Sequence, residues 1–172
     1  MKENKILFLT RAAMIAAIYV VLTYVFAPFS FGEIQVRIAE ALTILPVFTP
    51  AAIPGLFVGC LVGNILGGAI LPDILCGSLA TLIGAWGTWK LRNILTGSAH
   101  LPLASVIPPI AANTIIVPFV LRYGYGVGLP IPLMMLTVGI GEIISCGILG
   151  ILIYTGLRAS SQKIFGQEAA RG

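Results

Sequence analysis

The charged residues that could do chemistry in this sequence are few, and they lie among long apolar stretches. One run, Glu33-Ile34-Gln35-Val36-Arg37-Ile38-Ala39-Glu40, contains three of them. At spacings of four and three, these side chains would share one face of a helix, where a guanidinium and two carboxylates can pair. An ionisable group within a bilayer faces protein or a wet cavity, because burying its charge in lipid is costly. The run is interpreted as a polar site, with a solvated helix end as the alternative for Glu33.

Further polar residues lie in or next to later apolar stretches. Glu142 is well inside one of them, and that stretch has no basic residue to neutralise it. We therefore interpret Glu142 as a carboxylate that binds a ligand. Asp73 begins another stretch, and Asn64 precedes it. Asn64 fits two interpretations equally well, a hydrogen bond to a neighbouring helix or a place in a cavity.

Composition shows what surrounds these charges. Of the 172 residues, 58% are hydrophobic and 9% are charged, whereas about a quarter of a soluble domain is charged. The net charge of +4 does not indicate nucleic-acid binding, because the basic residues collect at the chain ends and in one loop. The sequence therefore predicts an all-α integral membrane protein with a single domain, residues 1–172. No cleaved signal peptide is expected, since the first apolar run has full membrane length.

The apolar stretches predict the number of helices that position the charges. A helix that crosses the hydrocarbon core needs about 20 residues, so the chain has room for about six. Proline and polar breaks place these transmembrane helices at about residues 6–27, 33–47, 51–70, 73–91, 102–121 and 133–157. The basic residues before the first, after the fourth and after the sixth fall on one side. By the positive-inside rule that side, with both termini, is cytoplasmic.

This topology gathers the charges within the membrane toward its outer half. A cavity that opens outward and is closed to the cytoplasm is a binding site, because a continuous pore would need polar groups along its whole length. No metal site is expected, because the three cysteines lie in separate stretches without a CxxC spacing and the chain has one histidine. The cysteines are interpreted as small core residues.

Small residues predict where helices approach closely. The third predicted helix carries a glycine at every fourth position, which indicates internal packing: Gly55, Gly59, Gly63 and Gly67. The first carries two adjacent alanine pairs, Ala12 with Ala16 and Ala13 with Ala17. From their spacing alone, these pairs fit an internal contact and a contact with a separate protein equally well.

The same residues match a known family. The helix count, the alanine pairs and the runs Gln35-Val36-Arg37-Ile38-Ala39-Glu40-Ala41-Leu42-Thr43 and Ile53-Pro54-Gly55-Leu56-Phe57-Val58-Gly59-Cys60 resemble the QueT family. Members of this family are substrate-binding S components of energy-coupling factor (ECF) transporters. Residues 73–80 and the Gly141-Glu142 pair fit as well, and the resemblance covers about residues 5 to 160.

The resemblance implies a protein of the bacterial cell membrane that captures a scarce micronutrient from outside. It would join one transmembrane coupling subunit and two cytosolic ATPases, with the alanine pairs facing the coupling subunit. The family is usually assigned queuosine precursors, which are 7-deazaguanines such as queuine, preQ0 and preQ1. A similar member has been linked to cobalamin.

The expected chemistry follows from the implied ligand. A 7-deazaguanine presents N1–H and an exocyclic amine, which a carboxylate can accept, and a carbonyl to which Arg or Asn can donate. Its ring can stack on an aromatic face, for which Phe119, Tyr123 and Tyr125 are candidates. For the two tyrosines, an anchor at the membrane interface is the favoured alternative. The expected substrate-binding residues are Arg37, Glu40, Asn64, Asp73, Asn113, Phe119 and Glu142.

Two other functional classes compete with an S component. The sequence contains no G-x-x-x-x-G-K-[ST] loop, so ATP hydrolysis is expected in partner subunits and the chain itself is not expected to be an enzyme. A stand-alone secondary carrier would commonly show inverted halves with paired broken helices. A membrane enzyme would depend on lone carboxylates such as Glu142 or Asp73. No cofactor is expected.

Overall fold

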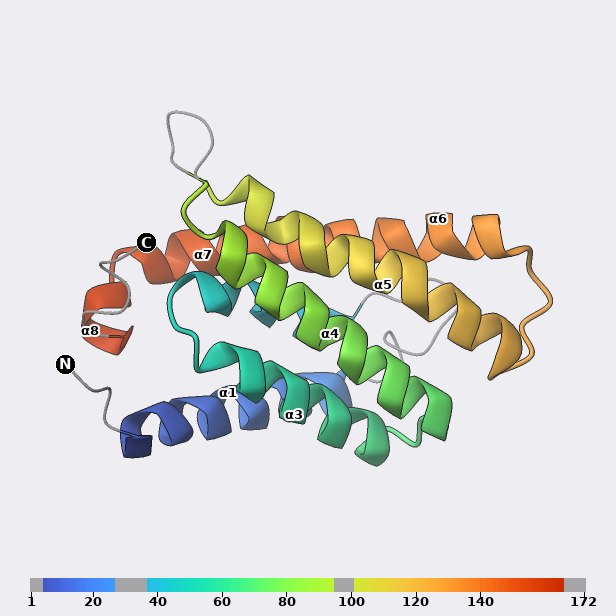
Figure 1. Ribbon diagram of the computed structural model, residues 1–172, viewed down its shortest axis with the longest axis horizontal. Coiled ribbons are helices and arrows are strands. Elements are labelled where there is room, and N and C mark those ends of the chain that lie inside the picture. Colours follow the sequence, from blue (N-terminus) through green and yellow to red (C-terminus); the bar gives the residue numbers. More distant parts are fainter. Residues whose placement is uncertain (1–4, 27–36, 95–100, 166–172) are drawn as a thin grey trace.

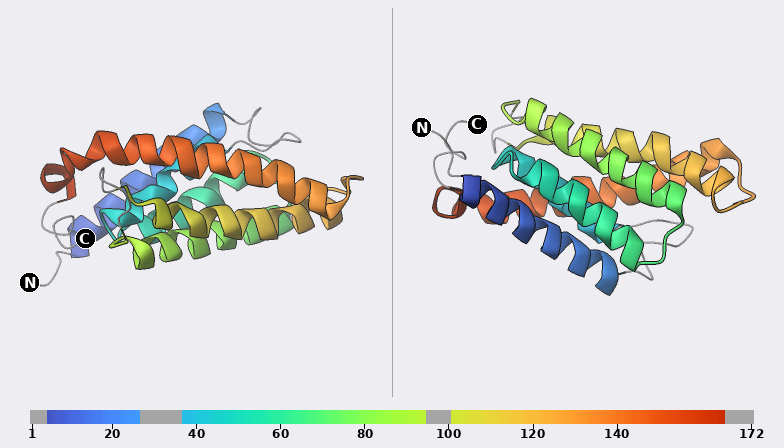
Figure 2. Two further views of the ribbon diagram at one scale, coloured as in Figure 1. Left: turned by 90° about the horizontal axis from the view of Figure 1, so that it is seen from above. Right: turned by 60° about the horizontal axis from the view of Figure 1, so that its bottom comes forward.

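The computed structural model describes residues 5–26, 37–94 and 101–165 (Figure 1). These residues form a bundle of helices that run along the long axis of the molecule (Figures 1 and 2). The α-helices are α1 (Lys5–Val25), α3 (Ala52–Leu66), α4 (Leu71–Leu91), α5 (Leu103–Tyr123), α6 (Ile131–Glu142), α7 (Gly150–Arg158) and α8 (Ser161–Phe165). A 3₁₀ helix, η1 (Ile38–Val47), precedes α3, and a π-helix, η2 (Ile143–Leu149), joins α6 to α7.

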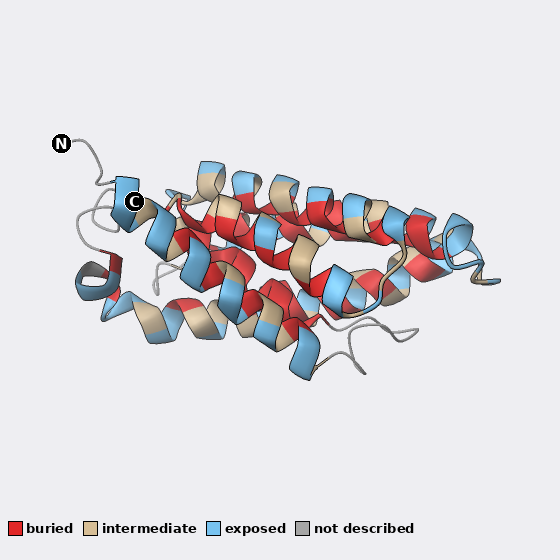
Figure 3. Ribbon diagram, turned by 90° about the horizontal axis from the view of Figure 1, so that it is seen from below, coloured by how far each residue is buried: buried red, intermediate tan, exposed pale blue. Residues whose placement is uncertain are grey.

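Within the described part of the chain, three helical segments are long and apolar enough to cross a membrane. They are α1, α5 and the continuous helix Ile131–Arg158 of 28 residues. Large apolar side chains point outward along them; Ile6 is 74% exposed and Leu152 is 61% exposed. Figure 3 shows the same division, with buried residues facing the interior and exposed ones covering the outside. The all-helical membrane class is therefore supported, while six spans and the orientation of the termini stay predictions.

Helices α1 and α3 lie side by side because α3 presents glycines to α1 (Figure 2). A Cβ atom at Gly55 would lie 2.7 Å from the carbonyl oxygen of Ala12, and one at Gly59 would lie 2.8 Å from Cβ of Tyr19. Such distances leave no room for a methyl group, so the two backbones approach closely. The prediction that this glycine ridge packs internally is confirmed for the helix pair α1 and α3.

The segment expected as the second helix has a different structure. Residues 33–36, with Glu33, lie outside the described residues, and Arg37 is extended at φ −85° and ψ 91°. Ile38–Val47 then forms ten residues of 3₁₀ helix, which includes Pro46. Runs of 3₁₀ helix longer than three or four residues are uncommon. This one is held by contacts with α1, α4, η2 and α7 in the middle of the bundle.

The last long helix is continuous but not uniform. It is α-helical up to Glu142, becomes a π-helix over Ile143–Leu149 and returns to α at Gly150. Insertions of π-helix in α-helices are rare and frequently occur at functional sites, because the wider turn changes the direction of the side chains. The π-helix begins directly after Glu142, the acid predicted to bind a ligand.

Candidate functional site

Glu40 is the most enclosed of the predicted site residues, at 0% exposure. Its Oε1 atom accepts hydrogen bonds from the hydroxyls of Tyr19 on α1 and Thr81 on α4, the latter at 2.8 Å. Its Oε2 atom has no hydrogen-bond partner. A buried carboxylate oxygen without a donor is costly, so this atom is positioned to accept a hydrogen bond from a ligand.

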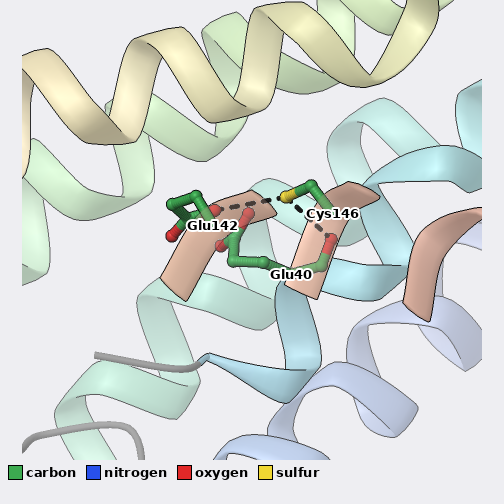
Figure 4. A group of neighbouring side chains, drawn as sticks. All are labelled: Glu40, Glu142 and Cys146. Carbon is green, nitrogen blue, oxygen red and sulfur yellow. Dashed lines mark hydrogen bonds between the residues drawn. The ribbon is translucent and has the colours of Figure 1, made fainter. Parts of the chain in front are cut away.

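Glu142 and Cys146 lie against Glu40 from the other side (Figure 4). The Cys146 thiol is 3.2 Å from Oε2 of Glu142 and 3.5 Å from the backbone carbonyl of Glu40. One oxygen from each carboxylate and the Cys146 sulfur all lie within 4.8 Å of one another. The structure therefore brings the acids of two distant segments to one point, and it adds a thiol that the sequence interpretation had assigned to packing alone.

A second polar group surrounds Arg37, which is 5% exposed. Its guanidinium forms an ion pair with Asp73 at the start of α4, with an N–O distance of 3.4 Å. Asp73 also accepts a 2.9 Å hydrogen bond from the hydroxyl of Tyr125, in the loop between α5 and α6. Partial burial and the Asp73 charge raise the pKa of Tyr125, so this phenol remains a donor at neutral pH. The α5–α6 loop is thereby tied to the start of α4.

Gly77 explains how three side chains converge beside α4. A Cβ atom at this position would lie 3.2 Å from the amide nitrogen of Asn64, 3.2 Å from an oxygen of Asp73 and 3.5 Å from a nitrogen of Arg37. Because Gly77 has no side chain, these groups pack against its backbone. Asn64 therefore lies in this polar group, and its place in a ligand cavity stays a prediction.

Cys60 connects the two groups. Its sulfur is 3.6 Å from the amide nitrogen of Asn64 and 3.4 Å from the hydroxyl of Thr81. Thr81 also donates to Glu40. The contacts from Tyr125 through Asp73, Arg37 and the residues around Gly77 to Glu40 and Glu142 therefore make one continuous polar cluster inside an apolar bundle.

The remaining expected residues have different positions. Asn113 on α5 is 1% exposed, lies close to Glu142, and has an amide nitrogen without a hydrogen-bond partner. It therefore belongs to the cluster as a second unused polar group. Phe119 is 43% exposed and lines a separate apolar pocket with Pro72, Cys76 and neighbouring residues. The structure does not place Phe119 with the cluster.

Sequence analysis did not select Tyr19, Thr81 or Cys146, and it favoured an interface role for Tyr125. Tyr19 could have been selected by its spacing, because it follows Ala12 by seven positions and Ala16 by three. It therefore falls on the face that the structure buries: Ala12, Ile15, Tyr19 and Thr23. A tyrosine in such a stripe must direct its hydroxyl to a partner. Thr81 had no comparable signal, since hydroxyl residues in apolar helices often bond their own backbone.

The two alanine pairs of α1 face in different directions. Ala12 is buried, and the α-carbon of Ala16 would lie 3.1 Å from a Cβ at Gly59. This pair therefore packs within the chain. Ala13 and Ala17 are exposed on the opposite side of the helix.

The sequence matches the family described as QueT transporter over residues 9–159. The chain belongs to the QueT transporter family. It is also 33% identical, over 85 residues, to the queuosine precursor transporter QueT of Lactococcus lactis subsp. cremoris (strain MG1363). That alignment covers 48% of this chain and 50% of the relative, so the chain spans about half the length of the curated relative it matches. No solved structure matches.

Proposed function

We propose that this chain captures a queuosine precursor from outside the cell, as the S subunit of an ECF-type importer. Membership of the QueT transporter family supports a transport role, and the name of the Lactococcus relative supports this class of substrate. The observation that carries the proposal is the buried cluster, in which Glu40 and Asn113 keep polar atoms without partners.

The cluster suits the polar edge of a 7-deazaguanine. Glu40 and Glu142 would accept from N–H donors of the ligand, and Asn113 or Arg37 would donate to the ring carbonyl. These groups come from η1, α5 and the end of α6. A ligand held between them would therefore contact all three of these elements at once. Asp73 and Asn64 would hold Arg37 in place.

The orientation and the partners are part of the proposal. Six spans with cytoplasmic termini would place the Tyr125 loop outside, above the Arg37–Asp73 pair. The exposed alanines Ala13 and Ala17 would meet the coupling subunit, since small residues allow another helix to approach closely. ATP would be hydrolysed by separate ATPase subunits.

Binding is tested first on the purified chain in detergent, titrated by calorimetry with queuine, preQ1, preQ0 and cobalamin. Saturable binding of the deazaguanines without binding of cobalamin is the expected result. Tight binding of cobalamin alone would replace the proposed substrate. Recovery of a coupling subunit and two ATPases with the tagged chain from its native membrane would support the S-subunit role, and uptake by the chain alone would contradict it.

Topology is tested separately by labelling in whole cells. A cysteine at Gly128, exposed in the α5–α6 loop, should react with an impermeant maleimide above the wild-type background. A cysteine at Ile94, 52% exposed beyond the other end of α4, should react after the cells are permeabilised. The opposite pattern would invert the proposed orientation.

A further inference from the structure

The buried cluster contains more acidic than basic side chains. Among the residues that the structure describes, the buried charged side chains are Arg37, Glu40, Asp73 and Glu142. Arg37 supplies one positive charge, and it forms an ion pair with Asp73. Two further carboxylates remain, and they lie close together. Two acids at such a distance in a water-poor interior repel each other when both are ionised, so one of them holds a proton unless a positive charge lies between them.

The side chains that hydrogen-bond these two acids are neutral. Tyr19 and Thr81 donate to one oxygen of Glu40, and Cys146 lies 3.2 Å from one oxygen of Glu142. Hydroxyl and thiol donors are neutral, and they leave Oε2 of Glu40 without a partner at 0% exposure. The unused oxygen therefore belongs to this pair of acids, where a positively charged donor would relieve their repulsion.

We infer that the Glu40–Glu142 pair is a subsite for a protonated amine. The inference rests on the proposed function and narrows its substrate class to 7-deazaguanines with a cationic aminomethyl group on the ring. An ammonium has three N–H donors and can serve both carboxylates at once. A nitrile at the same ring position is neutral and offers only an acceptor, which both carboxylates repel. The site therefore selects preQ1, which carries the aminomethyl group, over preQ0, which carries the nitrile.

A divalent metal ion is a less suitable occupant, although three donors converge. Oε1 of Glu40 already accepts two hydrogen bonds, and the thiol of Cys146 is 3.5 Å from a backbone carbonyl. Metal coordination would require this thiol to lose its proton, which would add a third negative charge next to the two acids. An ammonium requires no such change.

The test compares two ligands that differ at one ring substituent. The purified chain is titrated with preQ1 and preQ0 in the wild type and in the variants Glu40→Gln and Glu142→Gln. Replacing a charge-assisted hydrogen bond corresponds to roughly ten- to a hundredfold in affinity, so wild type should favour preQ1 by about that factor. In each Gln variant the affinities for preQ1 and preQ0 should agree to within about threefold, mainly because preQ1 binds more weakly. The control Thr155→Val, at an exposed position on α7, should leave the ratio unchanged.

The outcomes separate this inference from the proposed function. Equal and tight binding of both ligands by the wild type would overturn the amine subsite while leaving the proposed function in place. Binding of neither ligand would overturn both. A rise in melting temperature with Zn²⁺ that preQ1 does not reverse would assign the cluster to a metal instead. Because the wild-type ratio needs no variant, the inference stays falsifiable if a Gln variant fails to fold.

Discussion

The contact between α1 and α3 leads to a prediction about both stability and binding. In Gly59→Ala, the new methyl carbon would lie 2.8 Å from Cβ of Tyr19 and 3.1 Å from the α-carbon of Ala16. Carbon atoms pack at about 3.5–4.0 Å, so the helices must separate by a sizeable fraction of an ångström. Overpacking of this kind costs about 1–3 kcal/mol. It also displaces Tyr19, which donates to Glu40.

Gly156→Ala is the matched control for this substitution. Gly156 lies within α7, and nothing lies within 4 Å of a Cβ built there. Both substitutions gain the same helix propensity of alanine over glycine, about 1 kcal/mol, so their difference isolates the overpacking cost. For a chain of this size, 1 kcal/mol corresponds to roughly 2–4 °C. Gly59→Ala should therefore melt roughly 2–12 °C below Gly156→Ala.

The assay is thermal unfolding in detergent, followed by calorimetric titration with preQ1. Gly59→Ala should also bind preQ1 more weakly than Gly156→Ala does, because the hydroxyl of Tyr19 helps to fix Glu40. Equal melting temperatures would show that α1 and α3 are not in close contact. A lower melting temperature with unchanged affinity would show that Tyr19 plays no part in the ligand site.

Three further predictions test other parts of the cluster and the partner face. Gly77→Ala should weaken ligand binding by about tenfold in the same titration, because its methyl group would push against Asn64 and its neighbours. Tyr125→Phe removes the hydrogen bond to Asp73 and should raise the ligand dissociation rate severalfold in stopped-flow measurements; an unchanged rate would show that this hydrogen bond does not help to retain the ligand. Ala17→Trp should abolish transport and leave binding by the purified chain intact, whereas Ala12→Trp should unfold the protein, because Ala12 is buried. Wild-type transport by Ala17→Trp would remove this face from the proposed interface.

Most of the cluster was predictable because charge in an apolar chain is costly. A carboxylate such as Glu142 could be selected without knowledge of the fold, since an unpaired acid within a predicted span requires a partner. The glycine ridge of α3 was predictable for a similar reason, because a four-residue period leaves little doubt about which face is bare. Both inferences need only the residues of a single helix and no knowledge of its neighbours.

The remainder depended on tertiary structure. The helical pattern around Arg37 suggested pairing along its own segment, but the backbone is extended there and the guanidinium reaches Asp73, 36 positions later. The π-helix after Glu142 was not predicted, and in the structure it packs against η1 and α5. The aromatic prediction at Phe119 was based on depth in the membrane, which does not determine the direction of a side chain.

Packing and binding are linked through the small residues of α1 and α3. The close approach at Gly55 and Gly59 places the hydroxyl of Tyr19 within hydrogen-bond reach of Glu40, so the ridge that holds the helices together also positions a donor in the site. Ala12 and Ala16 lie on this inner face, where they pack against the glycines of α3. Only the outer pair, Ala13 and Ala17, can meet another protein without opening the bundle. One side of α1 therefore supports the candidate site through Tyr19, and the other side leaves Ala13 and Ala17 exposed.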